Sequence, residues 1–147
     1  MGGSIVVGVD GSPVSMAALR WAVDEAVLRD CDVAAISAWH RDKGLVSGPM
    51  SAEMAVQLSD GHMKSLGQKV LDEAMYDIGN VGVRIRPVLA EGDPRGVLVD
   101  ASAEADLLVV GNHGHGVVAE ALLGSVSAHC LHHAACPVVV VKEEKIG

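Results

Sequence analysis

Residues 5–12 read IVVGVDGS, and this stretch decides the fold. Its apolar part, residues 5–9, predicts a buried β-strand, and the turn-forming residues Asp10-Gly11-Ser12 end that strand. From Ser12 onward the apolar residues recur at helical spacing. Ser12 suits the N-cap of this helix and Pro13 its first position. These residues therefore predict a strand, a tight turn and a helix in succession.

The same alternation continues along the 147 residues of the chain. Further strands are predicted at residues 33–39, 83–88, 107–110 and 137–141. Further helices are predicted at residues 51–78, 93–105 and 125–135, with Asp93 as a cap and Pro94 in the first turn. Because no internal repeat or linker interrupts this pattern, we expect residues 1–147 to form a single domain.

The residues within the strands indicate their order in the sheet. Strands separated by helices pair in parallel, and strands covered on both faces are apolar throughout, as the first and fourth are here. The third strand carries Arg84, Arg86 and Pro87, which are typical of a sheet edge. We therefore predict an α/β fold with one doubly wound, five-stranded parallel sheet in the order 3-2-1-4-5. Ligands of such sheets bind where the order reverses, here between the first and fourth strands.

Polar and glycine-rich residues follow both of these central strands. Gly124 and Ser125 begin the last helix, whose first amides lack intrahelical partners and attract anions. The hydroxyls of Ser125 and Ser127 could add donors, while Asp10, across the crevice, could accept hydrogen bonds from a ribose diol. This arrangement predicts a nucleotide site, with the alternative that the glycines only make a turn.

The pattern Gly111-x2-Gly114-x9-Gly124-Ser125 resembles the ATP-binding signature of the universal stress protein family. Residues 5–12 and the end CPVVVV, residues 136–141, are similar to that family as well. The resemblance implies the same 3-2-1-4-5 fold and a cytoplasmic homodimer that binds an adenine nucleotide: ATP, AMP or cyclic AMP, with Mg²⁺ accompanying the phosphates.

The resemblance also implies roles for individual residues. Asp10 would bind the ribose. The phosphates would be held by Gly111, Gly114, Gly124, Ser125, Val126 and Ser127. Val9, Ala38 and Val110 would line the adenine side, largely through backbone atoms. His113 and His115 stand where relatives often carry arginine, so we expect weaker binding that is tighter near pH 6 than near pH 8.

Charge and composition restrict the partners. Eleven basic and nineteen acidic residues give a net charge of −8, which argues against nucleic acid and anionic membranes as partners. Three cysteines favour a reducing cytoplasm over a disulfide framework. The apolar strand Val138–Val141 is an edge in the predicted order, so we expect a homodimer that pairs through it.

Catalysis and metal binding are not expected. His129 and His133 stand four residues apart on one helix, but no third ligand has a recognised spacing, so a polar face is the simpler interpretation. The glycine-rich segment contains no Lys or Arg to clamp a transferring phosphoryl group. We therefore expect a nucleotide-binding protein that signals in a stress response, without catalytic residues. The alternatives are a slow ATPase or autophosphorylating enzyme, with Ser125 or Ser127 as acceptor, and an interaction dimer that binds no nucleotide.

Overall fold

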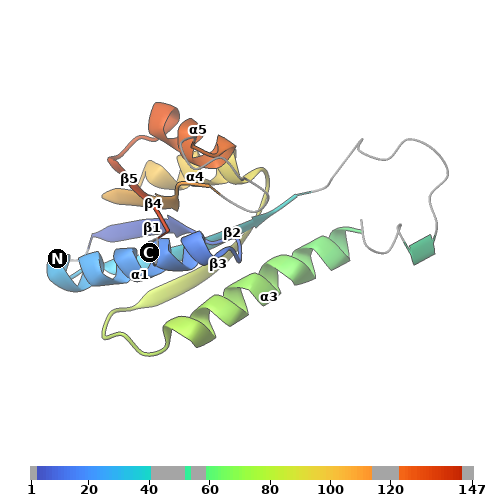
Figure 1. The fold of residues 1–147 in the computed structure, drawn as a ribbon, viewed down its shortest axis with the longest axis horizontal. Coiled ribbons are helices and arrows are strands. Elements are labelled where there is room, and N and C mark those ends of the chain that lie inside the picture. Colours follow the sequence, from blue (N-terminus) through green and yellow to red (C-terminus); the bar gives the residue numbers. More distant parts are fainter. Residues whose placement is uncertain (1–2, 41–51, 54–58, 114–122, 144–147) are drawn as a thin grey trace.

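The computed structural model describes residues 3–40, 52–53, 59–113 and 123–143. Five strands form one sheet in the order β3-β2-β1-β4-β5, and every neighbouring pair is parallel (Figure 1). The predicted fold class and strand order are therefore confirmed. The strands are β1 (Ser4–Gly8), β2 (Asp32–Trp39), β3 (Ile85–Glu91), β4 (Leu107–Gly111) and β5 (Val138–Val141). The helices are α1 (Pro13–Arg29), α3 (Asp60–Ile78), α4 (Pro94–Ser102) and α5 (Ser125–His133).

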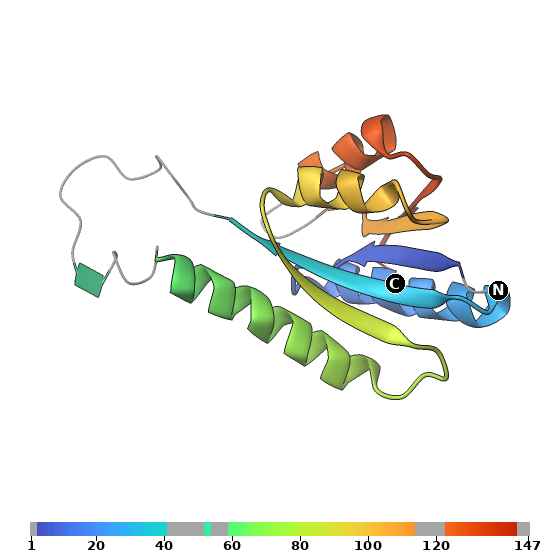
Figure 2. The ribbon, with the colours of Figure 1, turned by 180° about the vertical axis from the view of Figure 1, so that it is seen from behind.

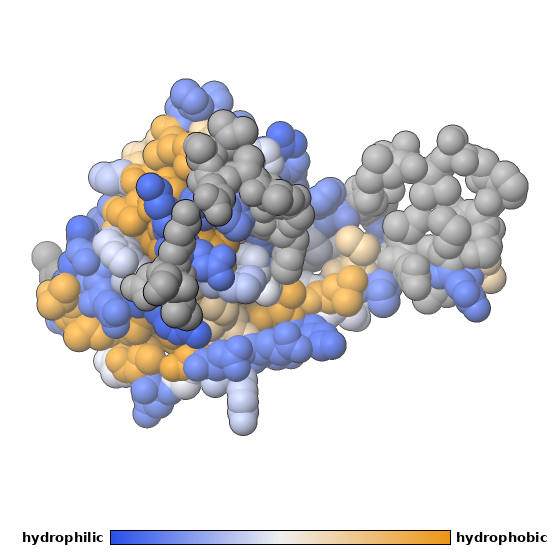
Figure 3. All heavy atoms as spheres, viewed as in Figure 1, coloured by the Kyte–Doolittle hydropathy of each residue, from blue (hydrophilic) through white to orange (hydrophobic). Residues whose placement is uncertain are grey.

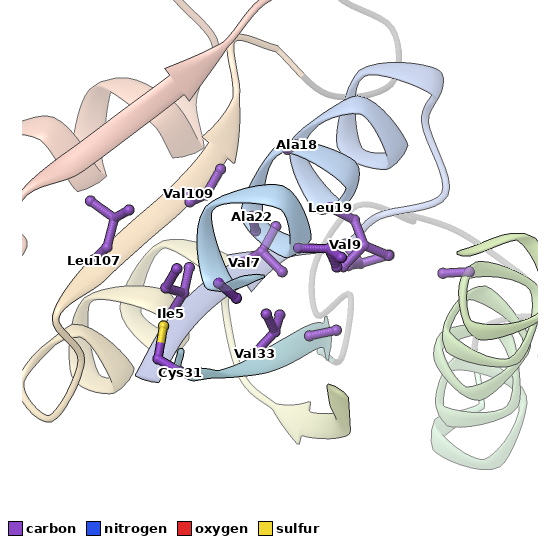
Figure 4. Packing of buried hydrophobic residues seen from close by; sticks show 14 residues of the cluster. Ile5, Val7, Val9, Ala18, Leu19, Ala22, Cys31, Val33, Leu107 and Val109 are labelled. Atoms are coloured by element: carbon purple, nitrogen blue, oxygen red, sulfur yellow. The ribbon is translucent and has the colours of Figure 1, made fainter. Parts of the chain in front are cut away.

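Helices cover both faces of the sheet. Helices α1 and α3 pack on one face, and α4 and α5 pack on the other (Figures 1 and 2). Val7 of β1 and Val109 of β4 face α1, whose alanines allow a close approach, and Figure 4 shows Val7 pointing toward Ala22. Their chain neighbours Val6 and Leu108 belong to a second core cluster beneath α4 and α5. Burial on both faces explains why these two strands are uniformly apolar.

Several element boundaries differ from the sequence prediction: helices α4 and α5 end earlier than predicted, at Ser102 and His133, and the largest differences concern the long helix and the third strand. The predicted helix at residues 51–78 does not run unbroken, because Ser59 is extended (φ −67°, ψ 150°) and caps α3 by accepting a hydrogen bond from the His62 amide. Within α3, Gly67 faces the sheet, and a Cβ there would stand 2.8 Å from the Leu89 side chain. Glycine at this position lets α3 pack closely on β3 without displacing the Leu89 side chain.

The third strand lies further along the chain than predicted. Strand β3 begins at Ile85 and continues to Glu91, beyond the predicted end at residue 88, because Glu91 still pairs with Trp39 of β2. Pro87 lies within β3, which is an edge strand as its composition predicted. The C-terminal end of β2 therefore lies at the same end of the sheet as Gly111, and Ala38 and Gly111 line one cavity.

Helix α4 begins as predicted, with Asp93 as its N-cap and Pro94 in the first turn. The Asp93 carboxylate accepts hydrogen bonds from the Arg95 amide (2.9 Å) and from the Arg95 guanidinium, Nε at 3.0 Å and Nη2 at 2.7 Å. These hydrogen bonds from Arg95 lower the pKa of the Asp93 carboxyl to about 2.

Replacing Asp93 with asparagine should cost stability only above acidic pH. A lowered pKa in the folded state stabilises the protein above the pKa of the unfolded chain, near 3.9, and this contribution disappears as the pH falls toward 2. Because both side chains are about half exposed (Arg95 49%, Asp93 45%), we expect a loss below about 1 kcal/mol at pH 7. Urea unfolding at pH 7 and pH 2.5 measures this difference. Arg95→Met should show the same loss, and an equal deficit at both pH values would contradict the assignment.

No helix among the described residues is both long enough and apolar enough to cross a membrane.

Candidate functional site

A cavity of about 490 Å³ lies at the carboxyl ends of β1 and β4, where the strand order reverses. Its size falls within the range of small-molecule sites, and its position is where doubly wound sheets bind ligands. Nine of the predicted site residues line it: Val9, Asp10, Ala38, Val110, Gly111, Gly124, Ser125, Val126 and Ser127. Gly114, the tenth, lies outside the described residues, as does His115.

Other lining residues were not predicted from the sequence. They are Gly8, Ser15, Ile36, His40, Pro94, Leu98 and His113, of which only His113 had been singled out. Three of the lining residues are spaced two apart in β2 or just after it: Ile36, Ala38 and His40. Because side chains alternate between the two faces of a strand, the sequence could have placed them on one face. Pro94 and Leu98 belong to α4, and only the crossover of that helix brings them to the cavity. Ile36 and Leu98 give the cavity an apolar wall.

The beginning of α5 forms the polar end of the cavity. Gly124 is the N-cap and supplies no side-chain cap, so among the described residues no side chain accepts from the first amides of the helix. The Gly124 amide itself donates to the Asn112 carbonyl oxygen at 2.7 Å. The donors that remain for an anion are the backbone amides of Ser125, Val126 and Ser127, reinforced by the helix dipole.

The two serines of this helix end have different environments. Ser127 is 1% exposed, and its hydroxyl donates to main-chain carbonyl oxygens, that of Asn112 at 2.9 Å or that of Gly124 at 3.1 Å. Ser125 is exposed at the cavity. The Ser127 hydroxyl therefore fastens the helix to the loop after β4, and the Ser125 hydroxyl is the one that a ligand can reach.

Asp10 lines the same cavity and lies two residues after the end of β1. Its Oδ1 accepts hydrogen bonds from the Ser12 amide (2.9 Å) and from the Ser12 hydroxyl. The Ser12 hydroxyl oxygen in turn accepts from the Ser15 amide at 3.2 Å and so caps α1. This turn fixes the Asp10 side chain while leaving the residue exposed, as a hydrogen-bond acceptor for a ligand must be.

Close packing accounts for two of the glycines. A Cβ on Gly111 would lie 2.9 Å from Val14 Cγ1 and 3.4 Å from the Val14 carbonyl carbon of α1. A Cβ on Gly124 would lie 3.1 Å from the His113 Cα. Both glycines therefore let backbone segments approach at the cavity, whether or not a ligand touches them.

Asn112 connects the site to the edge of the sheet. Its amide donates to the Val141 carbonyl of β5 at 2.8 Å, and its carbonyl accepts from Gly124 and Ser127 of the α5 start. Its side chain is buried, and Oδ1 has no hydrogen-bond partner among the described residues. The helix end is thus fixed to β5 through the main chain of one residue.

Charge in the described lining comes from few groups. Asp10 is its one carboxylate, His40 and His113 are its titratable bases, and no Lys or Arg is among the lining residues that the structure describes. Arg95 follows the lining residue Pro94, but its guanidinium is held by Asp93. Such a site can bind a phosphorylated ligand through amide donors, and its described lining contains no cationic clamp of the kind that phosphoryl-transfer enzymes use.

Comparison with known proteins gives the family. The family model described as the universal stress protein family matches residues 1–142. Universal stress protein MJ0531 of Methanocaldococcus jannaschii is 34% identical over 143 residues, which cover 96% of this chain and 82% of that protein. Universal stress protein Rv2623 of Mycobacterium tuberculosis is 35% identical over 148 residues, but they cover 95% of this chain and only 48% of that protein. The chain thus spans about half the length of its mycobacterial relatives.

A solved structure that contains a bound cyclic nucleotide has the same fold as this chain. The crystal structure of a universal stress protein in complex with cAMP superimposes with a TM-score of 0.69 at 27% identity, covering 96% of this chain and 97% of that one. The fold of this chain therefore agrees with that of a solved universal stress protein, and the family model matches nearly the whole chain. The chain belongs to the universal stress protein family.

Proposed function

We propose that this chain binds an adenine nucleotide, ATP, AMP or cyclic AMP, in the cavity between β1 and β4. The observation that carries the proposal is that the uncapped amides of α5 and the exposed Asp10 carboxylate line the same cavity of about 490 Å³. Amide donors suit phosphate, and a carboxylate held away from them suits a ribose diol. The cAMP complex of a relative with 27% identity supports this ligand class.

Each part of the nucleotide has a proposed place. Gly111, Gly124 and the amides of Ser125–Ser127 hold the phosphates, together with Gly114 and with Mg²⁺ where the ligand carries it. Asp10 binds the ribose. The adenine lies against Val9, Ala38 and Val110, and the apolar side chains of Ile36 and Leu98 extend this surface.

Native mass spectrometry of the purified protein, followed by calorimetric titration, tests this function. We expect one adenine nucleotide per chain, either retained through purification or bound on addition. Failure to bind ATP, AMP and cyclic AMP would contradict the proposal and favour an interaction protein. Sustained turnover near 1 s⁻¹ with Mg²⁺, the low end of typical enzymes, would instead favour an ATPase.

We further propose that residues 1–147 act as one domain within a cytoplasmic homodimer that signals in the stress response. Strand β5 is an edge of the described sheet, and all four of its valines are partly exposed. Figure 3 shows apolar atoms gathered at the side of the molecule where β5 lies. Apolar sheet edges tend to pair, and a two-fold axis allows β5 of a second copy to cover this one.

Binding of cyclic AMP should be tighter near pH 6 than near pH 8. His113 and His40 line the cavity, and an imidazole that gains a proton attracts a phosphate more strongly. Cyclic AMP is the suitable probe because its phosphodiester keeps one negative charge across this range. Replacing both lining histidines, His113→Gln together with His40→Gln, should flatten the profile measured by calorimetry. A flat profile in the wild-type protein would overturn the expectation.

A further inference from the structure

The second half of α5 carries three histidines, His129, His132 and His133, and none of them lines the nucleotide cavity. The rings of His129 and His133 lie close together, with centroids 4.4 Å apart and planes tilted by 39°. The rings of His132 and His133 are further apart, with centroids at 6.3 Å. The sequence favours a plain polar face here, because the spacing of His129 and His133 does not show how close together their rings lie.

The separation of the His129 and His133 rings suits one particular coordination geometry. With metal–nitrogen bonds of about 2.1 Å, two imidazoles bound at a right angle have centroids roughly 4.5 Å apart, and at a tetrahedral angle roughly 5.2 Å. The observed 4.4 Å therefore matches the right-angled arrangement. Tetragonal coordination by nitrogen is typical of Cu²⁺ and Ni²⁺, whereas tetrahedral coordination is typical of Zn²⁺.

The surroundings leave both imidazoles available. His129 is half-buried and His133 exposed, and neither ring has a hydrogen bond or ion pair with any other residue that the structure describes. His133 also lies in the last turn of α5, where the helix dipole favours positive charge. A divalent cation bound by both rings would replace their mutual contact with two ligand bonds.

Neighbouring thiols do not complete a closed site. Cys130 follows His129 in sequence, but it is completely buried, and burial raises the pKa of its thiol to about 11. It therefore stays protonated and packs in the core. Among the described residues, no group of three or more His, Cys, Asp or Glu side chains is arranged to hold a metal ion. With no further ligand supplied by the described residues, we expect water to fill the remaining coordination positions.

We propose that His129 and His133 form an open, two-histidine site for a divalent transition-metal ion that prefers tetragonal nitrogen coordination, Cu²⁺ or Ni²⁺. The site is independent of the proposed nucleotide function, because neither His129 nor His133 lines the nucleotide cavity. Imidazole ligands suit both ions, and Cu²⁺ should bind more tightly than Ni²⁺.

Calorimetric titration with Ni²⁺ tests the site without oxidising the cysteines. We expect the wild-type protein to bind one ion through this pair, and His129→Ala or His133→Ala to weaken binding at least about tenfold, because each removes one of two linked ligands. The matched control is His132→Ala, which removes an exposed imidazole from the same turn and should leave the affinity within about twofold. Circular dichroism checks that each variant retains its fold.

The double variant makes the test specific to a shared ion. If both rings bind one ion, His129→Ala combined with His133→Ala should weaken binding little more than either single substitution. The proposal is overturned by absence of Ni²⁺ binding in the wild-type protein, by an equal loss in His132→Ala, or by unchanged affinity in the double variant. A loss in both single variants together with tight binding of Zn²⁺ in preference to Ni²⁺ would overturn the tetragonal geometry.

Discussion

Replacing Val140 with proline should convert the proposed homodimer into a folded monomer. In β5 the Val141 carbonyl accepts from the Asn112 amide at 2.8 Å, and the Pro137 carbonyl accepts from the Leu108 amide at 3.0 Å. Because backbone groups alternate along a strand, Val139 and Val141 bond to β4, while the amides and carbonyls of Val138 and Val140 point to the free edge. A proline at residue 140 thus removes a donor that only a second chain would use.

Proline one position earlier provides the matched control. Val139→Pro removes a donor to the Leu108 carbonyl of β4, so it should cost about 1–3 kcal/mol of folding free energy through an unpaired buried acceptor. Val140→Pro should change stability less, because the ring replaces a partly buried valine with a side chain of similar size.

Sedimentation velocity and thermal unfolding distinguish the two positions. We expect Val140→Pro to sediment as a folded monomer and Val139→Pro to melt at a lower temperature than Val140→Pro. A Val140→Pro protein that remains dimeric would show that the two copies do not pair through this edge. The dimer proposal would then fail without affecting the proposed nucleotide site.

The fold could be predicted because its determinants are local. Short stretches of sequence are enough to recognise uniformly apolar strands and helical spacing. Arg84, Arg86 and Pro87 correctly indicated that the third strand is an edge of the sheet. The errors lie where an element's end depends on a distant partner. Strand β3 continues to Glu91 because β2 continues to Trp39. The start of α3 at Asp60 has a local cause instead, because Ser59 caps the helix by accepting from the His62 amide. Neither contact is visible in the periodicity of the segment itself.

The candidate site was predictable where residues follow a central strand directly. Asp10 follows β1 and Ser125 begins α5, so topology alone brought them to one cavity. The orientation of Ser127 was not predictable, because its hydroxyl is directed by the Asn112 carbonyl, fifteen residues earlier in the chain. Leu98 was missed for a similar reason, since the packing of α4 on β1 and β2 places it there. Side-chain partners across loops therefore limit what the sequence reveals about a site.

Replacing Ser125 with aspartate should change nucleotide affinity and protein stability in opposite directions. A carboxylate in the first turn of α5 interacts favourably with the helix dipole, so the protein should gain about 0.3–1 kcal/mol. The same carboxylate stands at the cavity, where Ser125 is exposed, and would repel a bound phosphate. We expect affinity for ATP to fall at least about 100-fold, a loss of about 2.7 kcal/mol.

Two comparisons isolate the electrostatic cause of that loss. Ser125→Asn has the same shape as the aspartate variant without its charge, so it should retain ATP affinity within about tenfold, the value of one neutral hydrogen bond. Adenosine, which carries no phosphate, should bind the aspartate variant and the wild-type protein equally. Calorimetry gives the affinities and thermal unfolding gives the stabilities. Equal losses for ATP and adenosine would mean that the substitution distorts the cavity, and unchanged ATP affinity would mean that the phosphates lie away from α5. Only repulsion at this helix end predicts a more stable protein that retains adenosine and releases ATP.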